Sequence, residues 1–255
     1  MPIQVTVATI NLHKRADRWN ERRHLLIEQI VEAAPDLVSL QEIHLPIRQG
    51  KWICKEINHR LTGLQKEPYR LIQKRYQHPL NGVLEAVGVL SRLPVLYHVG
   101  IGLGQGGRVA LRVHVELPSH QTMDFVATQL HQVSFEKEAR EEQAMKLMGW
   151  LHSHKRVPIQ VVAGDLNETP DGPAIAYIKQ SFRSAYAQCY GREPLATYPT
   201  HLVGGESPAA CLDYIFYSAA VHRVIDAALF CTTADREDDT LYPSDHVGLV
   251  ATLEV

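Results

Sequence analysis

The sequence of 255 residues lacks the features that mark secreted, membrane-spanning and zinc-binding proteins. Its four cysteines are widely spaced and form no Cys-x-x-Cys pair, so neither a disulfide framework nor a zinc site is indicated. No apolar run approaches the roughly 18 residues that a membrane span needs. Residues 1–4 have neither the basic region nor the apolar stretch of a secretory signal, so we expect a cytoplasmic protein without a membrane span.

A large excess of charge of one sign is also missing. The formal net charge of −2 gives no sign of a general nucleic-acid-binding surface, although it allows a local one. The hydrophobic content of 45% is ordinary for a globular protein, and the length allows a sizeable core. We therefore expect a single domain over residues 1–255, and the sequence indicates no oligomeric state.

The apolar pattern predicts strands and helices along the whole chain. Helical spacing predicts helices at 19–33, 46–61, 135–152 and 173–178. Strands are expected at 4–10, 37–40, 69–76, 83–91, 95–102, 108–116, 123–130, 159–163, 212–217, 221–229 and 247–253. Asn81-Gly82 predicts a hairpin turn between two of them. One α/β domain with two sheets and outer helices fits this order best.

Side chains that can bind a metal or move a proton stand at the ends of several predicted strands. Asn11 follows the first strand, Glu42 follows the second, and Asp165 and Asn167 follow 159–163. Polar groups on the loops of a rigid scaffold can assemble one site from distant parts of the chain. Carboxylate and amide oxygens dominate the set, which suits a hard cation such as Mg²⁺ better than zinc.

A further cluster precedes the last predicted strand. Ser244-Asp245-His246 places a carboxylate beside an imidazole, which titrates near neutral pH. Asp213 is an acid at the start of an apolar strand and needs a partner, for which a histidine is suitable. Taken alone, Asp165 or Asp245 could cap a turn, and Asp213 could belong to a structural ion pair. Their combination indicates one site.

Four segments in this order resemble a known family. They are Leu40-Gln41-Glu42, Gly164-Asp165-Leu166-Asn167, Asp213-Tyr214-Ile215 and Ser244-Asp245-His246. They are similar to the motifs of the endonuclease/exonuclease/phosphatase superfamily of DNase I-like, metal-dependent phosphoesterases, and the resemblance extends from Asn11 to His246. It implies a four-layer α/β (α+β) sandwich, in which two mixed β-sheets pack face to face between outer helices.

The resemblance also implies a metal ion and an activated water. Glu42 would be the principal carboxylate ligand of Mg²⁺ or Mn²⁺, with Asn11 and Asp245 close to the metal or its waters. Asp165 and Asn167 would position the attacking water or stabilise the phosphate.

Proton transfer and phosphate binding are implied for a second set of residues. His246, held by Asp213, would act as general base or as a donor to a phosphate oxygen. Arg108 falls where an arginine approaches the phosphate, which suits its forked donors. Glu85 falls where some nucleases of the family place a second acid.

Gln129 departs from the family pattern, which commonly has a histidine there. An amide can donate a hydrogen bond but cannot carry a proton. His131 would share the strand face with Gln129 if the strand extends that far. We expect Gln129 to lower phosphate stabilisation and His131 to substitute in part. Cys211 is a second departure, because a basic residue often precedes the Asp-Tyr-Ile segment.

Charged residues outside the motifs allow two interpretations. A basic group follows Asn11 and comprises Lys14, Arg15, Arg18, Arg22 and Arg23. These residues either contact a phosphate on the substrate path or form the solvated face of a helix. The acidic run at 235–239 would repel a nucleic acid passing that rim.

The sequence therefore predicts a divalent-metal-dependent hydrolase of phosphodiester bonds. A nuclease is one form, with nucleic acid as the substrate, and a lipid or small-molecule phosphodiesterase or phosphatase is another. The alternative from a different class is a pseudoenzyme that binds a phosphate ligand without turnover. Gln129 supports that alternative, whereas the retained cluster of mutually repelling acids counts against it.

Overall fold

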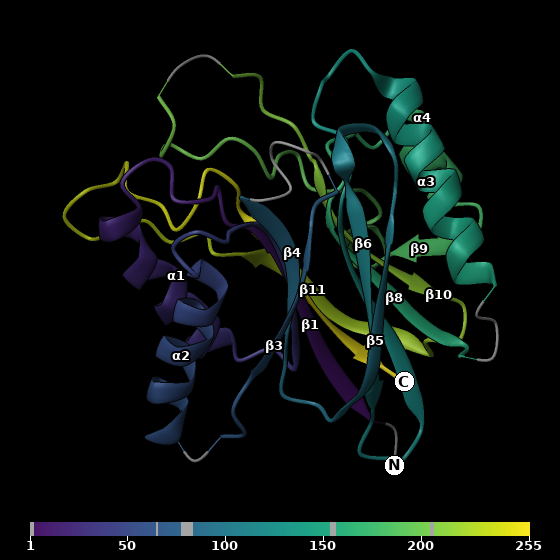
Figure 1. The fold of residues 1–255 in the computed structure, drawn as a ribbon, viewed down its shortest axis with the longest axis horizontal. Coiled ribbons are helices and arrows are strands. Elements are labelled where there is room, and N and C mark those ends of the chain that lie inside the picture. The colour runs from purple at the N-terminus through teal and green to yellow at the C-terminus, as the bar shows by residue number, and fades with distance from the viewer. Residues whose placement is uncertain (1–2, 65, 78–83, 154–156, 205–206) are drawn as a thin grey trace.

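Two six-stranded sheets pack face to face at the centre of the protein, and helices cover their outer faces (Figure 1). The structure is a computed structural model and describes the chain except for residues 1–2, 65, 78–83, 154–156 and 205–206. The predicted four-layer sandwich is confirmed. None of the helices in the described part of the chain is both long and apolar enough to cross a membrane.

The first sheet has the strand order β11-β12-β1-β2-β4-β3. Its strands are β1 (Gln4–Asn11), β2 (Leu37–His44), β3 (Arg70–Arg75), β4 (Glu85–Ser91), β11 (Arg223–Phe230) and β12 (Gly248–Glu254). The sheet is mixed, because β1 runs parallel to β2 and antiparallel to β12. The register pairs Asn11 with Gln41, and it thereby brings Asn11 next to the segment that carries Glu42.

The second sheet has the order β5-β6-β7-β8-β10-β9. Its strands are β5 (Val95–Gly102), β6 (Val109–Glu116), β7 (Thr122–Gln129), β8 (Ile159–Asp165), β9 (Phe182–Ser184) and β10 (Asp213–Ser218). Only the pairing of β7 with β8 is parallel among the described residues. The register places Gln129 and Asp213 on either side of Asp165, so three polar side chains meet at one edge.

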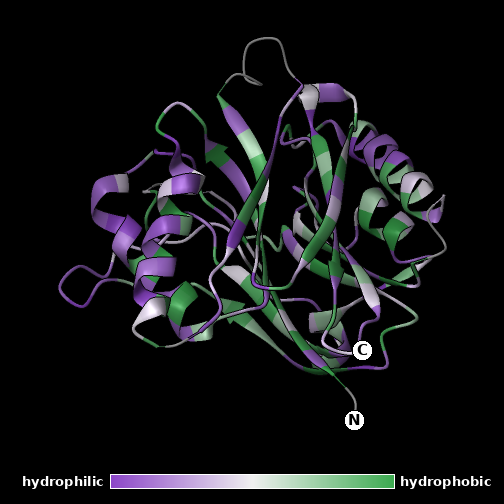
Figure 2. Cartoon of the chain, turned by 60° about the horizontal axis from the view of Figure 1, so that its bottom comes forward, coloured by the Kyte–Doolittle hydropathy of each residue, from purple (hydrophilic) through white to green (hydrophobic). Residues whose placement is uncertain are grey.

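Five α-helices complete the described structure, and four of them form the two outer layers. They are α1 (Trp19–Ala33), α2 (Gln49–Thr62), α3 (Lys137–His152), α4 (Pro173–Ile178) and α5 (Ala185–Tyr190). Figure 1 places α1 and α2 beside the first sheet and α3 and α4 beside the second. Hydrophobic residues concentrate on the strands, whereas the outward turns of the helices are largely hydrophilic (Figure 2).

The strands are apolar on both faces because each sheet lies between two other layers. In β1, Val5 and Val7 belong to the core between the sheets, whereas Ala8 and Ile10 belong to the core under α1 and α2. Side chains alternate between the faces of a strand, so a strand that is buried on both sides becomes an almost unbroken apolar run. These apolar runs are the signal from which the strands were predicted.

Several predicted boundaries shift in the structure. Helix α2 begins at Gln49 and not at Pro46, because Arg48 has a φ of 53° and the Gln49 side chain accepts a hydrogen bond from the His44 amide at 2.8 Å. Helix α3 begins at Lys137 and not at residue 135. The predicted turn at Asn81-Gly82 lies outside the described residues.

Three short elements were not predicted. The glycine-rich segment between the predicted strands 95–102 and 108–116 forms a 3₁₀ helix, η1 (Gln105–Gly107), where the sequence predicted no helix. β9 and α5 were also missed, because elements of three and six residues are too short to give a hydrophobic period.

Candidate active site

The candidate active site lies at one edge of the sandwich, where strand ends from both sheets meet. β1 ends at Asn11, β7 at Gln129 and β8 at Asp165, while β10 begins at Asp213. A pocket with a volume of about 610 Å³ is present there. Its lining includes Asn11, Glu42, Asp165, Asn167, Asp245 and His246.

An irregularity in β2 directs Glu42 into the site. The register between β2 and β4 shifts between Leu40 and Ile43, and Glu42 has a φ of 54°. The left-handed region costs an ordinary residue roughly 1–2 kcal/mol, so the surrounding structure must hold Glu42 there. Such bulges redirect a side chain and are common beside active sites.

Two amide groups hold Glu42 and Asp165 together. The Asn11 Nδ2 group donates to Glu42 Oε1 at 3.3 Å and to Asp165 Oδ2 at 3.0 Å. Gln129 Nε2 donates to the same two oxygens, at 2.9 Å each. These donors offset the repulsion between two carboxylates that face one another.

Gln129 is fixed by donors on its other side. The Tyr76 hydroxyl and Arg108 Nη1, at 2.6 Å, both donate to Gln129 Oε1, so the amide nitrogen must face the acids. Burial raises the pKa of Tyr76 and keeps its hydroxyl a donor. Arg108 is buried, packs over the Tyr76 ring and also donates to Gln132 at 2.9 Å. Its guanidinium therefore supports Gln129 from behind and does not line the pocket.

His246, Asp213 and Asp165 form a second buried group. His246 Nδ1 lies 2.8 Å from Asp213 Oδ2, and single ligand atoms of the three residues lie within 4.8 Å of one another. Burial lowers the pKa of His246, but the negative charges of Asp213 and its neighbours outweigh burial and raise it well above the ordinary value. Burial raises the pKa of Asp165 to about 6. The Tyr198 ring packs against His246, with centroids 4.9 Å apart.

Asn167 lies beside Asp165 in a turn. Its φ is 50°, its amide nitrogen donates to Asp165 Oδ1 at 2.9 Å, and its Nδ2 group donates to Asp165 Oδ2 at 3.2 Å. A third bond, to the Leu130 carbonyl at 3.1 Å, ties the turn to the end of β7. The predicted proximity of Asp165 and Asn167 is therefore present in the structure.

Asp245 is held by a histidine that the sequence analysis missed. His13 Nδ1 lies 2.9 Å from Asp245 Oδ2, and the Ser244 hydroxyl donates to Asp245 Oδ1 at 3.1 Å. Burial raises the pKa of Asp245, but these partners outweigh burial and lower it, so the carboxylate stays ionised. The only sequence signal for His13 is its position two residues after Asn11.

Lys14 is a second missed residue, because we assigned it to a basic group with no defined contact. Its Nζ lies 3.1 Å from Glu85 Oε1 and 3.9 Å from Glu42 Oε2. Glu85 therefore neighbours the site through Lys14, and it does not line the pocket itself.

The strand does not extend to His131, so the condition on which His131 would share a face with Gln129 is not met. β7 ends at Gln129, and His131 lies in the following loop, where its Nε2 is 2.7 Å from Glu136 Oε2. Its backbone amide donates to Gln143 Oε1 at 2.8 Å. Because α3 holds the loop in this way, His131 does not line the pocket beside Asp165.

For Arg22 the interpretation as part of a solvated helix face is wrong, whereas Arg15 and Arg18 of the same basic group are exposed. The Arg22 side chain is fully buried, and its guanidinium donates to backbone carbonyls of two loops. The acceptors include Leu12 at 3.1 Å, Ala16 at 3.0 Å and Pro243 at 2.7 Å. Arg22 thereby connects the loop after Asn11 to the loop that carries Asp245.

The donor set fits a hard divalent cation. Among the residues that the structure describes, the pocket wall offers carboxylate and amide oxygens together with a single imidazole, from His246, and no cysteine. The buried Asp213 Oδ1 has no hydrogen-bond partner within the described part of the chain. Oxygen-rich sites of this kind suit Mg²⁺ or Mn²⁺.

Comparison with known families agrees with this geometry. The chain matches the model of the endonuclease/exonuclease/phosphatase family over residues 8–246. The chain belongs to this family. Members of the endonuclease/exonuclease/phosphatase family are generally hydrolytic phosphoesterases that depend on a divalent metal. No curated protein matches the chain.

The similarity to solved structures covers nearly the whole chain. An endonuclease/exonuclease/phosphatase from Bacteroides vulgatus has a TM-score of 0.78 at 20% identity, with 99% of each chain covered. Truncated TDP2 from Caenorhabditis elegans has a TM-score of 0.79 at 16% identity, with 99% of this chain and 98% of that chain covered. The human Nocturnin catalytic domain with bound sulfate has a TM-score of 0.76 at 20% identity, with 100% and 96% covered. At these identities the likeness establishes the fold alone.

Proposed function

We propose that this protein is a Mg²⁺- or Mn²⁺-dependent hydrolase of phosphodiester bonds. The observation that carries the proposal is the meeting of several carboxylates, one imidazole and three amide side chains around a single pocket. Family membership supports the reaction class, because the family is generally hydrolytic. The four cysteines are free thiols, which supports the proposal of a protein that acts in the reducing cytoplasm.

Glu42, Asn11 and Asp245 would hold the metal ion. When bound, the ion would neutralise charge on the phosphoryl oxygens and lower the pKa of a coordinated water. His13 keeps Asp245 ionised, and the amide groups of Asn11 and Gln129 keep Glu42 in place. The protein thus positions the ligands before any cation arrives.

His246 and Asp165 would handle the protons. Asp213 occupies His246 Nδ1, so Nε2 is the nitrogen left to donate to a phosphate oxygen or to the leaving group. The raised pKa of His246 keeps it protonated for that role. Asp165, with a pKa raised to about 6 by burial, can take a proton from the attacking water at neutral pH. Asn167 orients Asp165 through two hydrogen bonds.

The phosphate-binding roles of Arg108, Gln129, His131 and Glu85 stay predictions. Gln129 is best placed among them, because its Nε2 lies 2.9 Å from both Glu42 and Asp165. We propose that Arg108 acts through Gln129. Lys137, at the start of α3, lines the pocket and adds a cation that the sequence analysis did not assign.

A nucleic acid is the substrate class that we favour. One similar structure, from Danio rerio, is TDP2 in complex with a single-strand DNA product; it matches with a TM-score of 0.78 at 18% identity. A lipid or small-molecule phosphoester is the alternative. An inactive, phosphate-binding protein is the other candidate, favoured by Lys14 and Gln129, which neutralise or bind the carboxylates without a metal.

The test is hydrolysis of bis(p-nitrophenyl) phosphate by metal-stripped protein before and after addition of Mg²⁺ or Mn²⁺. Glu42→Ala and His246→Ala should each abolish metal-dependent release. Glu32→Ala and His222→Ala are the matched controls, because both residues are exposed and lie away from the pocket. Metal binding without turnover of this diester, DNA, RNA or phospholipid would favour the inactive alternative.

A further inference from the structure

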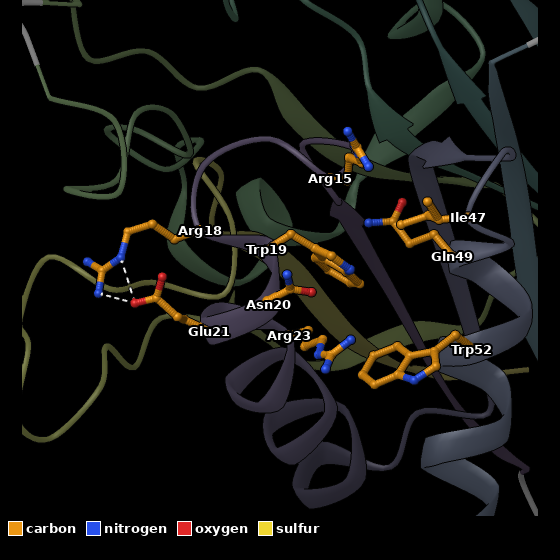
Figure 3. A pocket seen from close by; sticks show the side chains of 9 residues that line it. All are labelled: Arg15, Arg18, Trp19, Asn20, Glu21, Arg23, Ile47, Gln49 and Trp52. Atoms are coloured by element: carbon orange, nitrogen blue, oxygen red, sulfur yellow. Dashed lines mark hydrogen bonds and ion pairs between the residues drawn. The ribbon is translucent and has the colours of Figure 1, made fainter.

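A second pocket, of about 540 Å³, lies between the starts of α1 and α2 and has no role in the proposed hydrolysis (Figure 3). Its wall contains three arginines and two tryptophans, together with Gln49. They are Arg15, Arg18, Arg23, Trp19 and Trp52. The combination of cations and aromatic rings is the composition that binds single-stranded nucleic acid.

Two of the three arginines are available for an anion. Arg18 is already neutralised, because its Nη2 lies 2.8 Å from Glu21 Oε2 and 2.8 Å from Asp238 Oδ2. Figure 3 shows Arg18 turned toward Glu21 and away from the tryptophans. Arg15 and Arg23 form no ion pair with any residue that the structure describes. Their charges can therefore contact a phosphate.

The aromatic side of the pocket holds Arg23 in a defined orientation. The Arg23 guanidinium lies over the Trp52 ring, 4.8 Å from its centroid, and its buried Nε has no partner within the described structure. Trp19 meets Trp52 edge-on at 5.8 Å and is 7% exposed, so it forms the floor. A guanidinium plane stacked on a half-buried indole offers its free face to a base and its N–H groups to a phosphate.

Lys14 connects this pocket to the active site. The Gln49 side chain, in the wall of the second pocket, donates to the Lys14 carbonyl. The Lys14 ammonium lies 3.1 Å from Glu85 and 3.9 Å from Glu42. Arg15 follows directly in the chain. A small phosphoester bound at Glu42 would not occupy both pockets, whereas a polynucleotide strand would pass from one to the other.

Acidic residues limit what can lie beyond the pocket. Asp238 and Glu21 stand next to Arg18, and the neighbouring cavity is lined by Asp235 and Glu237 among others. Negative charge at this rim repels a second phosphate backbone. The arrangement therefore favours one strand over a duplex.

We propose that this pocket binds a phosphate and the adjoining base of a single-stranded nucleic acid whose scissile phosphate lies at Glu42. Arg15 and Arg23 contact the phosphate, and the Arg23–Trp52 stack contacts the base. The inference rests on the proposed function and names its substrate class.

The experiment measures binding of a fluorescein-labelled, ten-nucleotide DNA strand in Mg²⁺ by fluorescence anisotropy, in full-length His246→Ala protein so that the strand stays intact. Adding Arg15→Ala or Arg23→Ala should weaken binding about five- to tenfold, and each should reduce the slope of log K against log salt by about one. Arg192→Ala is the matched control, because Arg192 is an exposed arginine outside this pocket. It should change the affinity less than twofold.

Three results would overturn the inference. They are an unchanged affinity in both pocket variants, an equal loss in Arg192→Ala, or binding of duplex DNA as tight as that of the strand. Tighter binding of inositol hexakisphosphate than of the strand would reject the substrate class. Hydrolysis separates this inference from the proposed function. Arg192→Ala should cleave bis(p-nitrophenyl) phosphate at the wild-type rate, and a wild type that cleaves nothing would refute the function while the binding result still decides the pocket.

Discussion

Replacement of Gln129 by leucine should destabilise the metal-free protein, and Mg²⁺ should restore part of the loss. The Gln129 side chain is fully buried and takes part in four hydrogen bonds, with Glu42, Asp165, Tyr76 and Arg108. Leucine has a similar size but can make none of them. Water cannot easily replace the lost partners, because the site behind Gln129 is closed.

The expected magnitude follows from the groups that are left without partners. A buried donor or acceptor that loses its partner costs about 1–3 kcal/mol. Arg108 keeps its hydrogen bond to Gln132, so the penalty for its lost bond should be at the lower end of this range. The Tyr76 hydroxyl loses Gln129 Oε1 as its acceptor. With the weakened hold on the two carboxylates, we expect the free energy of unfolding to fall by about 3–4 kcal/mol.

Urea denaturation in EDTA and again in Mg²⁺ measures both effects. A ligand at one hundred times its Kd stabilises a protein by about 2.7 kcal/mol. The gain should be larger in Gln129→Leu than in the wild type, because the Gln129 amide occupies the carboxylate oxygens that a cation would take. Gln29→Leu is the control, since Gln29 lies at the surface and bonds Thr233 there. A loss below about 1 kcal/mol, or equal gains from Mg²⁺, would refute the reasoning.

Three further predictions concern the same site. In EDTA, the stabilisation that comes from protonated His246 should be fully present below pH 6.5, the ordinary pKa of a histidine, and should be lost as the pH rises through the raised pKa of the folded protein. Urea denaturation over a range of pH measures this dependence, and His246→Gln should abolish it. Asp213→Asn should lower kcat about 100-fold or more with little change in KM, because it removes the carboxylate that orients and charges His246, and equal kinetics in both proteins would contradict this. Gln129→His should raise turnover of a chromogenic diester, since an imidazole can stabilise the phosphate as a cation; a rate at or below wild type would reject the role given to Gln129.

Much of the candidate site could be predicted because several of its residues lie at the ends of strands that the apolar pattern reveals. Asn11 and Asp165 each stand at the last position of a buried strand, and the register of parallel strands brings such positions to one edge. The family resemblance added roles to these residues and gave the four-layer order of the sheets. Neither source needed knowledge of loop geometry.

The residues that were missed depend on loops and on contacts between distant segments. His13 reaches Asp245 and Lys14 reaches Glu85 from a loop in which both residues have a φ above 50°. No periodic pattern signals such a conformation. His131 was placed beside Gln129 only if the strand continued, and the hydrogen-bonded ladder ends at Gln129 although the next residue, Leu130, is also apolar and buried. Sequence spacing cannot show where a strand stops when the next residues are also buried.

The burial of Arg22 has a consequence for redesign of this protein. One guanidinium holds the loop after Asn11 and the loop at Pro243, which are more than two hundred positions apart in the chain. If only one of these loops were replaced by that of another family member, its carbonyl groups would not be positioned to accept hydrogen bonds from Arg22. Exchange of substrate preference between relatives should succeed only when both loops and the first two turns of α1 are transplanted as one unit.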